Sequence, residues 1–335
     1  MTVYGFSRRE LLAGTSMLGA ATLLGLPRTT AAEPPPEIQK IRLVHTPAIC
    51  LAPQYLAEDL LRMEGFSEVE YVDIPTPTGV GLLGAGRADV TMGAAPDVVA
   101  ALDKGQGVLS LAGIHAGCYE LFAHGRIAAI KDLKDKSVVV TGDDATERIF
   151  ISSIVAYVGV NPRDIRWITI PSAGDAMQHF VDGKADAFLA FAPQPQELRI
   201  KKVGRVILDT TTDRPWSQYF CCMVSARREF AQKYPVATKR ALRAFLKAAD
   251  ICAQEPEKVA RYLAAKGHEP RYEMGLEVLK RLPYVRWRQS NPEDTLRFHA
   301  LRLHEVGLIK SSPQKLIAQG TDWRLLNELK KELKG

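Results

Sequence analysis

Residues 86–96 read Gly-Arg-Ala-Asp-Val-Thr-Met-Gly-Ala-Ala-Pro, and residues 183–193 read Gly-Lys-Ala-Asp-Ala-Phe-Leu-Ala-Phe-Ala-Pro. The glycine, the alanine–aspartate pair and the closing alanine–proline pair coincide at an offset of 97 residues. The match extends backwards, because an apolar run and a strand-like run precede each copy, at 41–46 and 69–75 and again at 137–141 and 165–171. The chain thus contains one strand–helix–strand–helix–strand unit twice, which predicts two α/β lobes with a ligand cleft between them.

Strands and helices are predicted to alternate along both halves of the chain. Strands are expected at 38–44, 69–74, 90–92, 108–115, 119–123, 138–140, 165–170, 187–190, 206–208 and 219–224. Helices are expected at 51–63, 79–86, 97–104, 145–158, 174–182 and 196–202. In a C-terminal tail they are expected at 227–253, with a break near Tyr234-Pro235, and at 256–265, 272–281, 292–305 and 322–334. This alternation is typical of mainly parallel sheets flanked by helices. We expect residues 33–122 and 225–335 to form the first lobe, tail included, and residues 123–224 the second.

The first 32 residues have the features of an export signal. Ser7-Arg8-Arg9 followed by Glu-Leu-Leu is a twin-arginine pattern, and the apolar run at 11–26 is shorter than the ~18 residues of a membrane span. Small residues at 30–32 suit signal peptidase, so we expect cleavage after Ala32 and export of the folded protein to the periplasm. The alternative is an uncleaved N-terminal anchor.

Charge and length exclude some classes of function. The 335-residue chain has a formal charge of +6, and loss of residues 1–32 would lower it to +4. Basic and acidic residues alternate along helices such as the one expected at 227–247, which is typical of solvated faces and not of a nucleic-acid surface. A chain of this length can bury a substantial core and exceeds one ordinary domain, in keeping with two lobes.

The cysteine pattern predicts neither a metal cluster nor a fixed disulfide framework. The five cysteines are odd in number and contain no C-x-x-C pair. Folding before export would keep them reduced, so buried free thiols are one interpretation. The other is that Cys118 meets Cys221 or Cys222, because both segments are expected to cross between the lobes.

Ligands of parallel sheets bind at the carboxyl ends of the strands, beside the following helices. The loops at these positions are 46–51, 75–81, 93–97, 115–119, 141–146, 171–175 and 191–194. The candidate ligand-binding residues on these loops are Thr46, Ile49, Cys50, Thr78, Gly79, Ala95, Asp97, His115, Cys118, Tyr119, Thr141, Gly142, Asp143, Asp144, Ser172, Ala192 and Gln194.

The loop at 141–146 leaves the charge of the ligand open. Thr141 and Gly142 precede a helix, so their amides could hold a carboxylate, sulfonate or phosphate group. Asp143 and Asp144 complicate this interpretation. Either one caps the helix, or both face the cleft, in which case they would select an amine or ring N–H and disfavour an anion.

Other candidates also have a structural alternative. His115 could hydrogen-bond a ligand and Tyr119 could stack on it, or the segment could be a hinge that needs the backbone freedom of Gly117. Asp97 could face the cleft or simply stabilise a helix amino terminus. Cys50 is expected to be a small apolar wall residue and not a nucleophile.

Five short segments are distributed along nearly the whole mature chain, and their order and spacing are characteristic. They are Leu-Ala-Pro-Gln-Tyr-Leu-Ala at 51–57, Gly-Arg-Ala-Asp at 86–89, Lys-Asp-Leu-Lys-Asp-Lys-Ser-Val-Val-Val at 131–140, Gly-Lys-Ala-Asp at 183–186 and the return segment 225–235. In this order they resemble the periplasmic substrate-binding proteins of ABC importers in the nitrate, taurine and aliphatic-sulfonate group. That group shares its fold with the thiamine-pyrimidine precursor proteins.

The resemblance implies a periplasmic-binding-protein type II fold that closes on a small polar solute and docks on an ABC permease with its ATPase. The solute could be a sulfonate, taurine, a nitrate-like anion, a zwitterion or a heterocycle. Two loops depart from the family pattern, Thr-Gly-Asp-Asp-Ala-Thr at 141–146 and Phe-Ala-Pro-Gln at 191–194, so the anion chemistry of the best-known members is not carried over.

The resemblance favours a receptor over an enzyme. The sequence contains no G-x-S-x-G, P-loop or H-E-x-x-H motif. We expect a monomer that meets the membrane only through its permease, with no nucleic-acid partner, cofactor or metal. The alternatives are a thiamine-pyrimidine precursor binding protein, a related synthase that consumes its own histidine, and a sensory solute-binding subunit.

Overall fold

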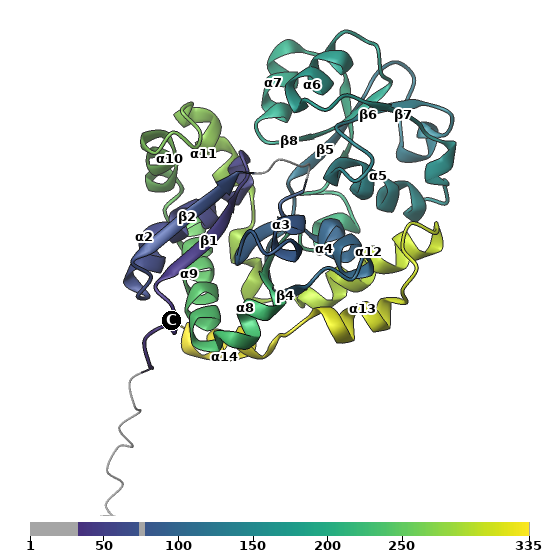
Figure 1. Ribbon diagram of the computed structural model, residues 1–335. Coiled ribbons are helices and arrows are strands. Elements are labelled where there is room, and N and C mark those ends of the chain that lie inside the picture. The colour runs from purple at the N-terminus through teal and green to yellow at the C-terminus, as the bar shows by residue number, and fades with distance from the viewer. Residues whose placement is uncertain (1–32, 74–77, 335) are drawn as a thin grey trace, which may run out of the picture. The chain divides into compact units, whose positions relative to one another are not determined.

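The computed structural model describes residues 33–73 and 78–334, and the chain from Pro35 onward forms one compact unit (Figure 1). The expected export signal at 1–32 and residues 75–77 of an expected ligand loop lie outside the described residues. None of the helices in the described ranges combines the length and apolar character that a membrane crossing requires.

The first sheet has the strand order β2-β1-β3-β10-β4. Its strands are β1 (Lys40–His45), β2 (Glu68–Asp73), β3 (Val90–Ala94), β4 (Val108–His115) and β10 (Cys222–Arg227). Strand β1 pairs in parallel with β2 and β3, whereas β10 runs antiparallel between β3 and β4. Four strands therefore share one direction, and the returning strand β10 opposes them.

The second sheet repeats this arrangement, with the order β7-β6-β8-β5-β9. Its strands are β5 (Tyr119–Ala123), β6 (Ser137–Val140), β7 (Arg166–Thr169), β8 (Ala187–Phe191) and β9 (Arg205–Asp209). Here β6 pairs in parallel with β7 and β8, and β5 runs antiparallel between β8 and β9. The predicted α/β fold with two mainly parallel sheets is confirmed.

The duplicated sequence motif has a structural role in both sheets. Gly86 and Gly183 adopt left-handed backbone conformations, with φ of 69° and 71°, as they turn the chain from a helix into the next strand. The aspartate three residues later then anchors the first strand of its unit. Asp89 Oδ2 accepts a hydrogen bond from the amide of Arg42 at 3.0 Å, and Asp186 Oδ2 accepts one from the amide of Ser137 at 2.7 Å.

Helices connect the strands of each unit. In the first unit they are α2 (Ala52–Met63), α3 (Val80–Gly84) and α4 (Ala95–Asp103). In the second they are α5 (Thr146–Tyr157), α6 (Ala173–Val181) and α7 (Gln194–Lys201). Helix α2 carries buried Tyr55 and Leu61 on the face that packs against the tail helix α9 (Pro235–Gln254), while Arg62 on its other side is exposed.

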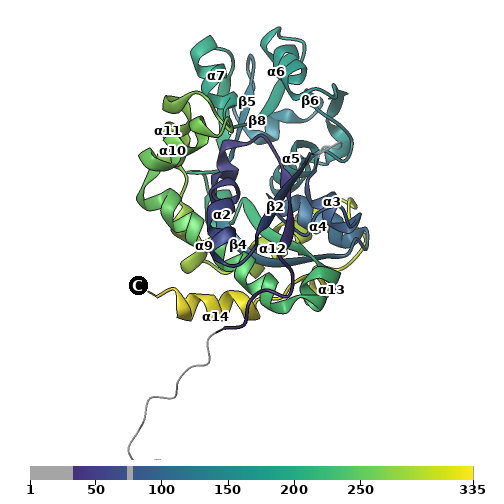
Figure 2. The same ribbon diagram turned by 60° about the vertical axis from the view of Figure 1, so that its left-hand side comes forward.

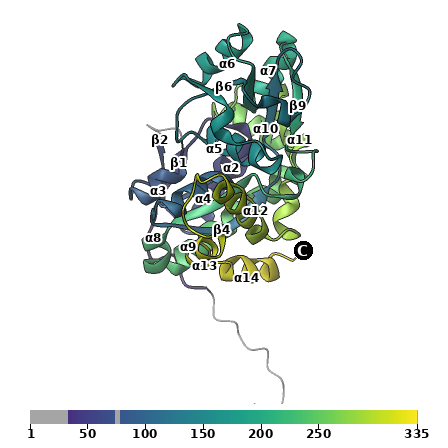
Figure 3. The ribbon, with the colours of Figure 1, turned by 90° about the vertical axis from the view of Figure 1, so that its right-hand side faces the viewer.

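The C-terminal tail packs on the first sheet and also reaches the second. It comprises α8 (Arg228–Lys233), α9, α10 (Pro256–Ala265), α11 (Tyr272–Arg281), α12 (Pro292–Glu305), α13 (Pro313–Gly320) and α14 (Arg324–Glu332). Helix α12 contacts both α4 and α5 (Figure 3). Helix α11 approaches α7, where Gln196 and Glu277 form a hydrogen bond of 3.4 Å (Figure 2). The tail therefore touches both repeat units.

Two expected elements differ from the structure. The strand expected at 219–224 lies at Cys222–Arg227, because residues 219–221 form an irregular link after a 3₁₀ turn at Trp216–Gln218. Helix α13 was not anticipated. It begins after Ser312, whose hydroxyl accepts a hydrogen bond from the amide of Lys315 at 3.3 Å, followed by a proline in the first turn.

Candidate functional site

A cavity of about 450 Å³ lies where the loops of the two repeat units face one another. The first unit contributes Thr46, Cys50, Met92 and Asp97, among others, and the second contributes residues from the loops after β6, β7 and β8. These loops follow the carboxyl ends of the strands, which is where a doubly wound sheet binds ligands. The cavity is large enough for a small organic molecule.

Seven of the candidate residues line this cavity: Thr46, Cys50, Gly79, Asp97, Tyr119, Thr141 and Gln194. The others lie outside its lining. Ile49 and Ala95 are buried in the core, Ser172 is exposed and caps α6, and Thr78 and Gly142 are partly exposed. His115, Cys118 and Ala192 are buried and do not line the cavity. Asp143 and Asp144 lie on the outer surface.

Asp97 is a buried carboxyl group with one unused oxygen. It lies in the first turn of α4 and is 5% exposed. Its Oδ2 accepts a hydrogen bond of 2.6 Å from the hydroxyl of Thr146, the first residue of α5, which links the two repeat units. Its Oδ1 has no partner among the described residues. Burial raises the pKa of Asp97 to about 8, so the group is largely protonated at neutral pH and can donate a hydrogen bond.

Glu147 is a second carboxyl group in the cavity lining, and sequence reasoning missed it. Its Oε1 accepts hydrogen bonds from the amide and the hydroxyl of Thr141, both at 2.5 Å. The Glu147 carboxylate thereby takes the hydrogen bond of the Thr141 amide, which the sequence had suggested as a donor to an anionic ligand. The signal that could have found it is an acidic residue in the first turn of a helix, next to the predicted capping aspartates.

The cavity lining contains no basic side chain among the described residues. Its two ionisable acids are Asp97 and Glu147, and much of the remaining wall is apolar, including Phe188, Leu189 and Phe191. An anion placed here would lose its hydration without gaining a cationic partner. The lining suits N–H donors and a flat or apolar body.

Asp143 and Asp144, which had left the charge of the ligand open, form ion pairs and do not line the cavity. Asp143 pairs with Arg148, and Asp144 pairs at 2.7 Å with Lys104, the residue that follows α4. Their side chains are 83% and 76% exposed. Neither caps α5, whose N-cap position is Ala145 with no side-chain cap bond. The capping and cleft-facing interpretations therefore both fail.

The chain crosses between the two sheets at 116–118 and returns at 210–221. The crossings are held together by Thr210, whose hydroxyl accepts from the amides of Cys118 and Tyr119 at 3.3 and 3.1 Å. Gly117 has a φ of +72°, and a Cβ there would lie 2.9 Å from the Cα of Thr211. Gly117 is thus required both for its left-handed backbone conformation and because a side chain would collide with Thr211.

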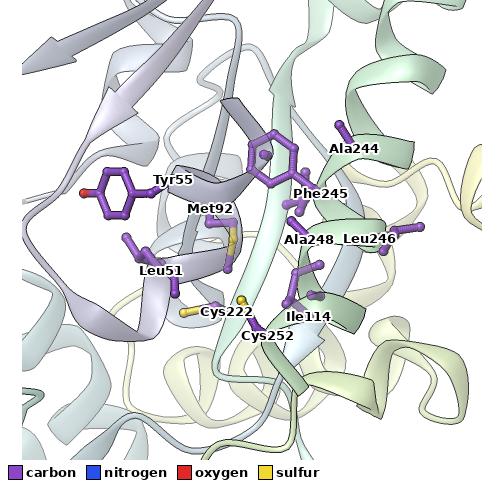
Figure 4. Packing of buried hydrophobic residues seen from close by; sticks show 14 of the residues in the cluster. Leu51, Tyr55, Met92, Ile114, Cys222, Ala244, Phe245, Leu246, Ala248 and Cys252 are labelled. Carbon is purple, nitrogen blue, oxygen red and sulfur yellow. The ribbon is translucent and has the colours of Figure 1, made fainter. Parts of the chain in front are cut away.

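All five cysteines are free and buried. The expected approach of Cys118 to a partner across the crossing is made with Cys222, at an Sγ–Sγ distance of 3.7 Å. Figure 4 shows Cys222 and Cys252 in a packed cluster with Leu51, Met92 and Ile114.

Comparison with solved structures supports the fold. The nitrate-binding protein NrtA of Synechocystis PCC 6803 aligns with a TM-score of 0.74 and 16% identity, covering 90% of each chain. The alkanesulfonate-binding protein SsuA of Xanthomonas axonopodis pv. citri, bound to MOPS, aligns with a TM-score of 0.71 and 17% identity, over 88% of this chain and 100% of the other. SsuA of Escherichia coli aligns with a TM-score of 0.64 and 18% identity, over 83% and 91%.

A search of curated proteins found no match. The family model described as NMT1/THI5 like matches residues 68–259, which include every described strand except β1, together with α8, α9 and the first residues of α10. More than half of the sequence therefore fits one family profile, and the chain belongs to the NMT1/THI5-like family.

Proposed function

We propose that this protein is the solute-binding receptor of an ABC importer. The observation that carries the proposal is the cavity formed by equivalent loops of two repeat units, at the carboxyl ends of their strands. Family membership and the nitrate- and sulfonate-binding structures of the same fold support it. The receptor works in the periplasm, as these neighbours do, and delivers its solute to a permease and its ATPase.

Solute binding and closure are coupled through contacts that span the cleft. The hydrogen bond between Thr146 and Asp97 and the ion pair between Lys104 and Asp144 join α4 to the start of α5. A solute favours the closed form only if it binds that form more tightly than the open one. Groups that touch both Asp97 and the Thr141–Glu147 pair satisfy this condition, because only closure brings the two sides together.

The solute class follows from the charges of the cavity. With two carboxyl groups and no described basic residue in the lining, the site favours a small amine or an N–H-bearing heterocycle over nitrate or a sulfonate. A protonated Asp97 donates to a ring nitrogen or carbonyl, and Glu147 accepts from an N–H or ammonium group. The aromatic residues Phe188 and Phe191 supply an apolar wall.

Thermal unfolding of the mature chain tests both the receptor and its solute class. We expect amines and pyrimidines to raise the melting temperature by several degrees at saturating concentration, and nitrate, taurine and alkanesulfonates to leave it unchanged. The variants Asp97→Asn and Glu147→Gln should lose the shift. The exposed control Asp143→Asn, whose carboxylate pairs with Arg148 of the same repeat unit, should keep it. A shift with nitrate or sulfonates alone contradicts the solute class. If neither the panel nor extract of the native cells gives a shift, the receptor proposal fails.

A synthase that consumes its own histidine is the enzymatic alternative within the family. The cavity lining includes no histidine among the described residues, and His115 is fully buried outside it. Mass spectrometry of the purified chain distinguishes the two functions, since a receptor releases an intact solute and keeps all seven histidines unmodified. A sensory role would be indicated by association with a membrane kinase in place of a permease.

The export route and assembly state belong to the same proposal. We infer export by the twin-arginine route, cleavage after Ala32 and a monomeric mature protein. Fractionation of cells expressing the chain with Arg8 and Arg9 changed to Lys should leave the precursor in the cytoplasm. N-terminal sequencing of the wild-type product should begin at Glu33.

A further inference from the structure

Three sulfur atoms from distant parts of the chain meet beside the cavity. They belong to Cys50 in the turn after β1, Cys118 in the outgoing crossing and Cys222 at the start of β10. Their Sγ atoms all lie within 4.8 Å of one another, and each residue is buried, with exposed fractions of 5%, 8% and 4%. Neighbouring thiols in a core are ordinary packing, but three converging sulfur atoms are a possible set of metal ligands.

The spacing of the sulfur atoms agrees with coordination of one ion. The 3.7 Å between Cys118 and Cys222 is far longer than a disulfide bond of about 2.05 Å. It is close to the edge of a tetrahedron with Zn–S bonds of about 2.3 Å, which is roughly 3.8 Å. The Sγ atom of Cys50 lies within 4.8 Å of the other two. A movement of at most about one ångström would therefore complete the same geometry.

His115 provides a second, independent observation. Its ring is fully buried, and Nδ1 lies 3.9 Å from the sulfur of Cys118. Nδ1 also lies 3.3 Å from the carbonyl oxygen of Ala116, and Nε2 has no hydrogen-bond partner among the described residues. The buried imidazole therefore lies beside the sulfur of Cys118, and a shift of Nδ1 toward an ion bound there would make it a fourth ligand.

An ion can reach the three sulfur atoms from the cavity. Cys50 and Cys222 both line the 450 Å³ cavity, so the cluster forms part of its floor. Cys118 closes the cluster from behind, where it lines a second, narrow cavity with Cys50 and Glu120. The described residues therefore offer an entry path, a ligand set of suitable size and a dry environment, as a buried metal site requires.

We propose that Cys50, Cys118 and Cys222 bind one thiophilic d¹⁰ ion, Zn²⁺ or Cu⁺, as thiolates, with His115 in reach as a fourth ligand. Coordination replaces the three thiol protons, which pass to solvent, and transfers no electrons. The ion joins the turn after β1 to both segments that connect the two sheets, so it stiffens the crossing. This site is independent of the identity of the cavity's solute and of the receptor proposal.

Metal titration of the reduced mature chain tests the proposal. We expect one Co²⁺ or Cd²⁺ per chain, with a thiolate-to-metal charge-transfer band, and displacement of that ion by Zn²⁺. A parallel titration with Cu⁺ against a cuprous chelator decides which ion binds more tightly. Each of Cys50→Ser, Cys118→Ser and Cys222→Ser should weaken binding by more than the roughly 10–100-fold that loss of an outer-shell partner costs. Cys252→Ala, at a buried cysteine of α9 that is not one of the three proposed ligands, should retain wild-type affinity.

A measurement on the wild-type chain keeps the test valid if a variant does not fold. Bound metal should protect three cysteines from alkylation in mildly denaturing buffer, and peptide mapping should identify them as Cys50, Cys118 and Cys222. The proposal is overturned if the reduced chain binds no ion at one per chain, or if protection falls on other residues. It is also overturned if all three serine variants fold and bind like the wild type, or if the only reaction seen is oxidation of Cys118 and Cys222 to a disulfide.

Discussion

At the residue scale, Asp97 shows how position changes the chemistry of a side chain. The sequence places it at a helix amino terminus, where a carboxylate would ordinarily be ionised and stabilised by the helix dipole. The structure buries it between two repeat units, with one oxygen bonded to Thr146 and the other without a described partner. Desolvation outweighs the hydrogen bond and raises the pKa of the carboxyl group to about 8.

This shift predicts a stability that falls as pH rises. Because the folded-state pKa of Asp97 lies above its ordinary value of 3.8, the folded chain binds the proton more tightly, and its contribution is complete below pH 4 and lost as pH rises toward 8. Asp97→Asn should remove this contribution and stabilise the chain at pH 8 relative to pH 5 by roughly 1–3 kcal/mol, compared with wild type. Urea unfolding at both pH values measures it, with Asp144→Asn as control. Equal pH dependence in Asp97→Asn and wild type would contradict the assignment.

At the scale of elements, the duplicated Gly-x-Ala-Asp motif explains why the two sheets share one strand order. In each unit the aspartate accepts a hydrogen bond from an amide of the first strand and so fixes β3 beside β1 and β8 beside β6. The two copies differ in their surroundings. Asp89 also accepts hydrogen bonds from the guanidinium groups of Arg42 and Arg227 and is 6% exposed, whereas the side chain of Asp186 is 37% exposed.

We predict that the two copies of the motif differ in their contribution to stability. Asp89→Ala leaves the guanidinium groups of Arg42 and Arg227 without their shared, buried carboxylate, and should cost about 3–5 kcal/mol in the free energy of unfolding. Asp186→Ala removes hydrogen bonds from Ser137 at a more exposed site and should cost about 1–2 kcal/mol. Chemical denaturation of both variants gives the comparison, and equal losses would refute the distinction.

The element scale also shows where local sequence was a sufficient guide. Helices α2, α9, α10, α11 and α12 agree closely with their expected ranges because each has an apolar face at helical spacing, and all but α11 have a proline at their start. Strand β10 begins later than expected, because the local sequence pattern does not distinguish the 3₁₀ turn at Trp216–Gln218 and the link after it from the start of a strand. Helix α13 is short, and its cap at Ser312 was the available signal.

At the scale of the whole described chain, two crossing segments and the tail connect the repeat units. The tail contributes Arg281 of α11, whose guanidinium group pairs with Glu120 of β5 and Asp209 of β9. The crossings depend on Gly117, where both the left-handed backbone and the closeness of Thr211 exclude a side chain. A change at this glycine therefore affects how the two sheets face one another.

We expect Gly117→Ala to destabilise the fold by about 1–3 kcal/mol and to weaken solute binding at the same time, because the crossing must shift to relieve the contact with Thr211. Gly183→Ala is the matched control. It has a similar φ of +71° but no atom within 4 Å of the added Cβ, so it should cost about 1 kcal/mol and leave binding intact. Thermal unfolding with and without solute separates the effects, and the prediction fails if the two variants behave alike.

The sequence by itself determined the repeated unit, the two mainly parallel sheets and the loops that face the cavity. These follow from apolar periodicity and from a motif whose bonds lie within one unit, so nearby residues contain the needed information. Only the tertiary structure decided which acids face the cavity. Asp143 and Asp144 form ion pairs with Arg148 and Lys104 outside the cavity, whereas Asp97 and Glu147 line it. It also decided that Cys50, Cys118 and Cys222 meet. Their proximity depends on how two strand ends and a crossing pack in space, and no local pattern records that packing.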